Sequence, residues 1–383
     1  MFEQIRARLI EFRKDFTLTS NHDPATSILN VLKSFGLTYR PVADAGFSVE
    51  IPGNASSTNV IAVRFEISEC LKHTDTETSL NSKLAQEATC VEHILQSSVG
   101  LGVTRVLSLM HKEIKGKIRV IFQIKDNAAP SNTSLLIQQG VLNQVATIYA
   151  LQSNASIPVD SVGIKFGAIL ASKDTFTLKL YRKNGYASSP SNAQNIIQIA
   201  ANVIIALNHA TTRKMDPLQP VAISISSIHS TPDLSDIADS VILKGTFQAM
   251  NESITEQMFD LVENTVQGIT SAYNAEFQLN IEKHRPLLKT DQISTLNLLA
   301  AAEEALGEDH VIRLDYPTTG LEGLSEYLNV VPGTILLLGT GIDYSKPFYP
   351  DFQVLESIDR AIEIGVKTLS WALLKHLTQI RKT

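Results

Sequence analysis

The sequence predicts an α/β protein in which an α/β/α domain of catalytic type carries an inserted ferredoxin-like domain of order βαββαβ. Three observations predict it. The length of 383 residues allows two or three domains, at roughly 100–200 residues each. Up to about residue 170, runs typical of buried strands alternate with amphipathic helical stretches. From Thr175 onward, the strands alternate apolar and polar residues, as strands do when one face of a sheet meets solvent.

The elements of the first domain follow from apolar runs and from β-branched residues. The run from Val60 to Phe65 is typical of a strand buried on both faces, and the residues around Val120 repeat that composition. The predicted elements are strands at 59–67, 116–124, 159–167 and 334–339, and helices at 90–113, 134–151, 291–306 and from 356 onward.

The inserted domain is predicted from strands of period two that enclose two helices. A start signal at Ser189-Pro190-Ser191-Asn192 precedes the first of these helices. The predicted elements are strands at 175–183, 220–230, 240–250 and 275–283, and helices at 193–211 and 253–273. We therefore place the α/β domain at 1–172 plus 288–383, and the inserted lid or dimerisation domain at 173–287.

Composition narrows the possible partners and the location. The net charge is −6, and the 33 Lys and Arg residues are dispersed, which argues against nucleic acid and an anionic membrane surface. No apolar run approaches the roughly 18–20 residues that span a bilayer. The first residues mix both charge signs in a helical pattern, unlike a signal peptide. Two cysteines, Cys70 and Cys90, make no disulfide framework, so we expect a cytoplasmic protein.

Generic catalytic motifs are absent from the sequence. It contains no Walker loop, no CxxC, no HExxH and no GxSxG. The glycine pairs Gly100-x-Gly102 and Gly339-x-Gly341 are interpreted as packing points or turns, because a lone pair of glycines rarely cradles a phosphate.

Longer strings carry a specific resemblance. Residues 211–247 (TTRKMDPLQPVAISISSIHSTPDLSDIADSVILKGTF), 319–339 (TGLEGLSEYLNVVPGTILLLG) and 115–127 (KGKIRVIFQIKDN) are the strongest, and NVIAVRFEI and GAILASKDTF are weaker. Taken in the order of the chain, these strings cover nearly all of it and resemble the dinuclear-metal amidohydrolases, the family of aminoacylases, hippurate hydrolases, auxin-conjugate hydrolases and related carboxypeptidases. The resemblance implies the fold, an inserted lid and a homodimer formed through that lid.

The resemblance also implies where the metal ligands should be. In the family, a Cys, three His and acidic residues hold two divalent metals, and a Glu acts as general base. The general-base slot falls on Asp126, and the metal slots fall on Cys90, Glu92, Asn127, Lys165 and Lys346. A lysine ammonium has three protons and no free lone pair, so it cannot ligate zinc or manganese. We expect that the two-metal site is lost and that no cofactor is bound.

We hypothesise that two lysines replace the metals electrostatically. Lys165 and Lys346 would neutralise Glu92 and Asp126, because buried carboxylates without a counter-charge are costly. The alternative is that both lysines are solvated on surface loops. Cys90 likewise has the alternative of a small buried hydrophobe.

The resemblance also implies positions that would bind the ligand. Arg213 matches the Arg of the family's carboxylate clamp, and Ser235 replaces its Asn; a structural ion pair is the alternative for Arg213. Tyr186 replaces the lid histidine that stabilises the oxyanion. Gly320 and Glu322 match a glycine and a glutamate of the site.

Three functions remain open, and the sequence does not decide whether the chain is an enzyme. The first is a non-catalytic amidohydrolase relative that binds a small carboxylate or an acyl-amino acid. The second is an active hydrolase of N-acyl amino acids or peptides, with one zinc or manganese held by Cys90, His93 and Asp126. The third is a homodimeric scaffold subunit.

Overall fold

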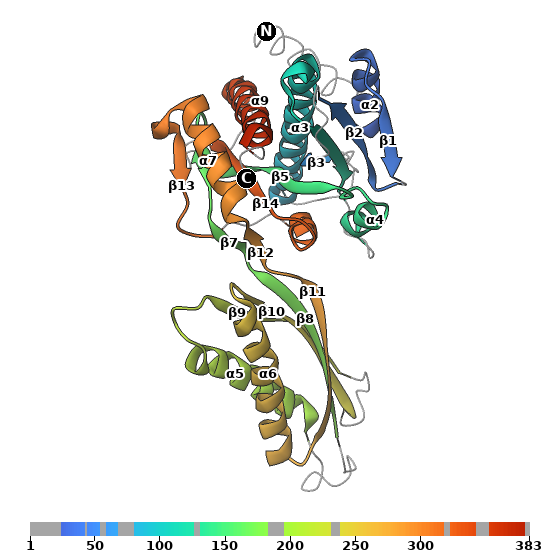
Figure 1. Cartoon of the computed structure of the whole chain (residues 1–383). Coiled ribbons are helices and arrows are strands. Elements are labelled where there is room, and N and C mark those ends of the chain that lie inside the picture. Colours follow the sequence, from blue (N-terminus) through green and yellow to red (C-terminus); the bar gives the residue numbers. More distant parts are fainter. Residues whose placement is uncertain are drawn as a thin grey trace. The chain divides into compact units, whose positions relative to one another are not determined.

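The computed structural model describes residues 24–42, 44–53, 59–67, 80–125, 131–182, 195–230, 238–317, 322–341 and 352–379. For residues 24, 80–94, 284, 322, 352–357 and 379 it describes the backbone alone. The chain divides into two compact units, residues 1–167 with 289–383, and residues 168–288. The predicted α/β class is confirmed, with a large mixed sheet in the first unit and a four-stranded antiparallel sheet in the second (Figure 1).

The sheet of the first unit has the order β1-β2-β4-β3-β5-β14-β6-β13. Its strands are β1 Tyr39–Val42, β2 Gly46–Pro52, β3 Val60–Ile67, β4 Lys117–Ile124, β5 Val145–Pro158, β6 Val162–Ile164, β13 Val311–Arg313 and β14 Gly333–Gly341. The neighbours β4, β3, β5 and β14 run parallel to one another, so their carboxyl ends meet at one edge of the sheet. β6 runs antiparallel to β14.

Helices cover both faces of this sheet. One face packs against α2 Pro24–Ser34, α3 Leu80–Leu109, α7 Gln292–Leu306 and α9 Phe352–Gln379, which share one hydrophobic core with the strands. α3 and α9 lie side by side on this face, and α7 lies next to α9 (Figure 1). The short helices α4 Asn132–Gln138, η3 Glu322–Leu324 and α8 Ser325–Leu328 lie together, and α4 packs against β4. Other short elements are η1 His111–Glu113, η2 Glu308–His310 and β12 Leu288–Thr290, which pairs with β7 Gly167–Leu170.

The predicted helix at 134–151 is wrong over its second half. α4 ends at Gln138, and residues from Val145 onward form β5. Gly140 and Gln144 have positive φ angles of 80° and 64°, which turn the chain out of the helix. β5 then lies between β3 and β14, where its apolar side chains are buried.

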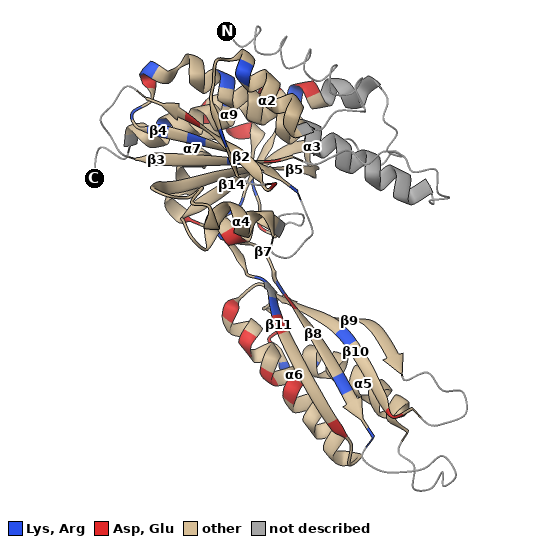
Figure 2. Cartoon of the chain, turned by 90° about the vertical axis from the view of Figure 1, so that its right-hand side faces the viewer, with Lys and Arg blue, Asp and Glu red and all other residues tan. Residues whose placement is uncertain are grey.

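The second unit has the predicted βαββαβ order. It contains β8 Ser172–Tyr181, α5 Ile196–Lys214, β9 Val221–Ser230, β10 Ser240–Ala249, α6 Glu252–Ala272 and β11 Glu276–Arg285. The sheet order is β11-β8-β10-β9, and every pair is antiparallel. Alternate residues of β8 are buried against the two helices, as the period of two predicts. The outer face of α6 carries a row of acidic residues, Glu252, Glu256, Asp260 and Glu263 (Figure 2).

Among the described helices, none has both the length and the apolar character needed to cross a membrane.

Candidate functional site

A buried polar cluster lies where β3 and β4 approach their carboxyl ends. We call it the β3–β4 cluster; its members are Arg64, Glu66, Gln96, Gln123, Lys125, Thr133 and Gln152. The period of two along β3 turns Arg64 and Glu66 away from the face that buries Phe65. The sequence signal for this cluster is the presence of two charged residues, Arg64 and Glu66, within an otherwise apolar strand run. Known catalytic motifs do not include this signal.

Arg64 is the centre of the cluster. Its side chain is 4% exposed, it forms an ion pair with Glu66, and its Nε donates to Gln123 Oε1 at 3.0 Å. The other carboxylate oxygen of Glu66 lies 3.6 Å from Lys125 Nζ. The Glu66 carboxylate therefore has a cation at each of its two oxygens.

The cluster also joins elements that are distant in the sequence. Gln96 on α3 accepts from the backbone N–H of Glu66 at 2.9 Å, and its amide donates to Gln152 of β5 at 3.4 Å. Gln123 donates to Thr133 Oγ1 at 2.8 Å, and Thr133 donates to the carbonyl of Gly323 at 3.1 Å. Helix α3, strands β3, β4 and β5, helix α4 and η3 are therefore held together at this edge of the sheet.

Tyr327 of α8 adds an unpaired buried group beside the cluster. Its side chain is fully buried, and its hydroxyl has no hydrogen-bond partner among the described residues. Burial raises the pKa of the Tyr327 phenol above its usual value, and the nearby Arg64 charge opposes this rise in part.

Some of the predicted slots lie in described helices that contribute to this cluster. Cys90, Glu92 and His93 belong to α3, one to two turns before Gln96, but their side chains lie outside the described part of the chain. Asp126 and Asn127, which follow Lys125, also lie outside it. Gly320 is not described, and Glu322 is described only as backbone at the start of η3.

Lys165 is the one predicted metal slot whose side chain the structure describes. It is half-buried, its Nζ donates to the carbonyl of Phe166 at 3.2 Å, and its own carbonyl accepts from Thr290 Oγ1 at 2.9 Å. It forms no ion pair with a described carboxylate. Strands β5 and β14 separate β6 from β3, a distance of about 14 Å at roughly 4.8 Å per strand. Since Lys346 lies outside the described residues, the pairing of both lysines with Asp126 and Glu92 stays a prediction.

Three of the predicted ligand residues, Arg213, Tyr186 and Ser235, belong to the second unit. Arg213 is exposed in the last turn of α5, and it forms no ion pair with another described residue, so a structural ion pair is not found there. Tyr186 and Ser235 lie outside the described ranges.

The described residues do not build a metal centre. Among them, no group of three His, Cys, Asp or Glu side chains could hold a metal ion. The Lys165 ammonium offers no lone pair, so this slot does not fit a zinc or manganese ligand.

Known proteins resemble the chain over most of its length. No protein-family model matches it. A probable hydrolase of Synechocystis sp. is 27% identical over 380 residues, which cover 97% of this chain and 96% of that protein. An N-acetylcysteine deacetylase of Bacillus subtilis is 26% identical over 300 residues, 78% of each chain.

A solved structure supports the same conclusion about the fold. The YXEP protein of Bacillus subtilis, a dinuclear-metal-binding peptidase from the M20 family, superposes with a TM-score of 0.72. It is 20% identical, and the match covers 95% of this chain and 98% of that one. The predicted resemblance is confirmed: the chain is similar in sequence to a hydrolase and to an N-acetylcysteine deacetylase, and its fold is similar to that of an M20 peptidase.

Proposed function

We propose that this amidohydrolase-like protein binds a small carboxylate of the N-acyl-amino-acid type and does not use a dinuclear metal centre. The observation that carries the proposal is Lys165, a half-buried ammonium in a slot where the family has a histidine ligand. Lys346 and Asn127 in two further slots support it, because neither an ammonium nor a neutral amide replaces the lost imidazole or carboxylate donor.

The ligand class follows from Arg213 and from the relatives. The exposed guanidinium of Arg213 has no counter-ion among the described residues and can bind a carboxylate through two parallel hydrogen bonds. One relative is an N-acetylcysteine deacetylase, so an N-acetylated amino acid is the first ligand to examine.

Calorimetric titration with N-acetyl-L-cysteine tests this proposal. We expect saturable binding, no binding of the methyl ester that lacks the carboxylate, and a roughly tenfold higher Kd for Arg213→Ala, about 1.4 kcal/mol. Lys214→Ala, which removes the neighbouring exposed charge, is the matched control and should leave the Kd unchanged.

Metal analysis of the protein purified without chelator tests the second part of the proposal, that the protein does not use a dinuclear metal centre. We expect substoichiometric zinc and manganese, and no release of acetate from the ligand. Near-stoichiometric metal, with hydrolysis that a chelator abolishes, would overturn the proposal in favour of an active hydrolase that uses Cys90, His93 and Asp126.

We infer that the second unit also mediates self-association. β9 is an edge strand of its sheet, and Ile228 on this strand is 50% exposed. Analytical ultracentrifugation should detect a dimer that Ile228→Lys dissociates. A monomer at all concentrations would contradict both this inference and a homodimeric scaffold.

A further inference from the structure

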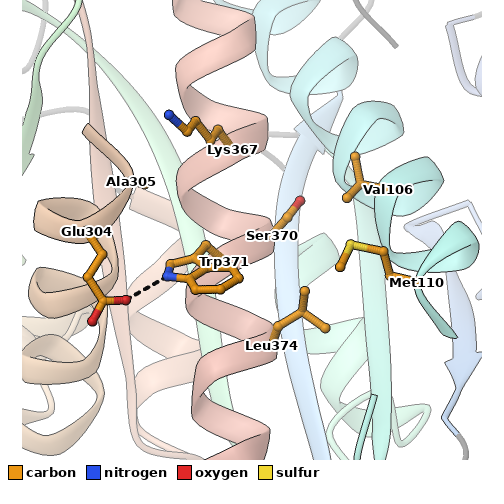
Figure 3. Close-up of a pocket in the computed structure, with 8 residues that line it drawn as sticks. All are labelled: Val106, Met110, Glu304, Ala305, Lys367, Ser370, Trp371 and Leu374. Carbon is orange, nitrogen blue, oxygen red and sulfur yellow. Dashed lines mark hydrogen bonds between the residues drawn. The ribbon is translucent and has the colours of Figure 1, made fainter. Parts of the chain in front are cut away.

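A groove on the helical face of the first unit is not part of the β3–β4 cluster. It lies between α3, α7 and α9 and encloses about 300 Å³ (Figure 3). Its walls are mainly apolar and include Val106, Met110, Ala305, Trp371 and Leu374. Trp371 is 45% exposed although it is the largest apolar side chain of the groove, so the described structure leaves apolar surface open here.

A buried hydroxyl without a partner lies beside this groove. Ser370 lines the groove, is 4% exposed, and its Oγ has no hydrogen-bond partner among the described residues. A buried hydroxyl is costly unless something bonds to it, so a polar ligand group that reached this atom from the groove would stabilise it.

The charges at the rim favour an anion. The Glu304 carboxylate accepts from Trp371 Nε1 at 2.8 Å and forms an ion pair with Lys375, so its charge is already offset. These two partners lower the pKa of Glu304. Lys367, one turn before Trp371 on α9, is exposed and forms no ion pair with a described residue (Figure 3). At the rim of this mainly apolar groove, the Lys367 ammonium is therefore a cation that no described carboxylate neutralises.

We propose that this groove binds a small amphipathic carboxylate with an aliphatic tail of about eight carbons, a size that suits a cavity of about 300 Å³. The tail packs between Trp371, Leu374 and the α3 side chains. The carboxylate lies at the rim, where it pairs with the Lys367 ammonium and accepts from the Ser370 hydroxyl. This site is independent of Arg213 and of the proposed function above.

The sequence supplies its own probe for the experiment. Trp371 is the single tryptophan of the chain, so tryptophan fluorescence reports on this groove alone. Titration of the full chain with octanoate, below its micelle concentration, should give a saturable change in that fluorescence. Octanol and octylamine, which have the same tail with a neutral or a cationic head, should bind at least tenfold more weakly.

Variants assign the binding to the groove. Lys367→Gln should raise the Kd for octanoate about tenfold, and Ser370→Ala should raise it about threefold. Lys289→Gln, which removes an exposed lysine outside the groove, and Arg213→Ala should leave it unchanged. Val106→Phe should fill the groove and abolish binding while the thermal unfolding transition remains cooperative.

Several outcomes would overturn the proposal. One is the absence of a saturable change up to millimolar octanoate in protein whose melting is normal. Equal affinity for octylamine would exclude a carboxylate site. A fluorescence change that follows protein concentration, and not octanoate, would assign the groove to a contact between two copies of the chain.

Discussion

At the scale of single residues, the first unit contains a buried trio that no motif indicated. His376 of α9 is 7% exposed, and its Nδ1 lies 2.6 Å from the hydroxyl of Tyr149 on β5. Asn297 of α7 donates to the same hydroxyl at 2.7 Å, and the Tyr149 O–H can donate to Nδ1 when this nitrogen carries no proton. Burial lowers the pKa of His376, with a smaller opposing effect of Asp291. His376 is therefore a neutral hydrogen-bond acceptor in the folded protein.

The first prediction concerns pH. Because the pKa of His376 is lower in the folded than in the unfolded chain, the unfolded chain binds more protons as the pH falls. The contribution of His376 is complete above about pH 6.5 and decreases through lower pH, by at most about 1.4 kcal/mol per pH unit. Urea unfolding between pH 7.5 and 5 should show a smaller pH slope for His376→Gln, whose Oε1 can still accept from Tyr149. Equal slopes for both proteins would refute this.

The second prediction concerns the β3–β4 cluster. Arg64→Met removes the buried ion-pair partner of Glu66, so we expect a loss of about 3 kcal/mol in the free energy of unfolding. The double variant Arg64→Met/Glu66→Gln removes the buried charge as well and should recover at least half of that loss. Chemical denaturation of the three proteins measures both values; an Arg64→Met loss below 1 kcal/mol would show that the pair is not important for stability.

At the scale of elements, the glycine pairs are packing points, as the sequence suggested. A Cβ on Gly100 of α3 would lie 2.7 Å from the Phe122 ring and 2.9 Å from the Phe65 ring, both in the core. A Cβ on Gly339 of β14 would lie 2.0 Å from the carbonyl of Pro158. Both glycines allow a close approach to the sheet or within it.

The third prediction compares two helical glycines. Gly100→Ala should destabilise the protein by about 1–3 kcal/mol, because the helix must move away from two packed rings. Gly268→Ala on α6 meets open space, so it should stabilise by about 0.5–1 kcal/mol through helix propensity. Differential scanning calorimetry gives the two shifts, which should have opposite signs. A stabilising Gly100→Ala would contradict the tight contact between α3 and the sheet.

At the scale of the whole molecule, each unit has a hydrophobic core of its own. Among the described residues, the buried core of the second unit lies between Phe176 and Val266, on α5, α6, β8 and β10, with Met215 directly after α5. The first unit buries its strands beneath α2, α3, α7 and α9. Neither of these cores contains residues of the other unit. Each unit therefore has its own hydrophobic core, which a domain needs in order to fold independently.

The fourth prediction follows from this separation. A chain of residues 168–288 should fold alone, with far-ultraviolet circular dichroism of a mixed α/β protein and a cooperative thermal transition. Met258→Ala, which removes a fully buried core side chain, should lower its unfolding free energy by about 2–5 kcal/mol. A gradual, non-cooperative melting curve for the unsubstituted fragment would refute independent folding.

Local pattern alone was enough to predict the second unit and most of the first. The period of two in β8 and β10 and the apolar faces of α5 and α6 reflect contacts made within each element or with the next one. The sequence strings also predicted the relationship to amidohydrolases, since motif order survives where overall identity is low. The sequence alone likewise shows lysines at positions 165 and 346, where the family resemblance predicts histidine ligands.

Three features depend on tertiary structure and could not be predicted from local pattern: strand β5, the β3–β4 cluster and the groove of Trp371. β5 became a strand and not a helix because it fills the place between β3 and β14, which outweighs the helical pattern of residues 134–151. The β3–β4 cluster depends on pairs such as Thr133 with Gly323, which are 190 positions apart. The groove of Trp371 needs three helices from both ends of the chain. Periodicity reports which face of an element is buried, but not which distant residue it meets, so these sites emerge only when the chain is folded.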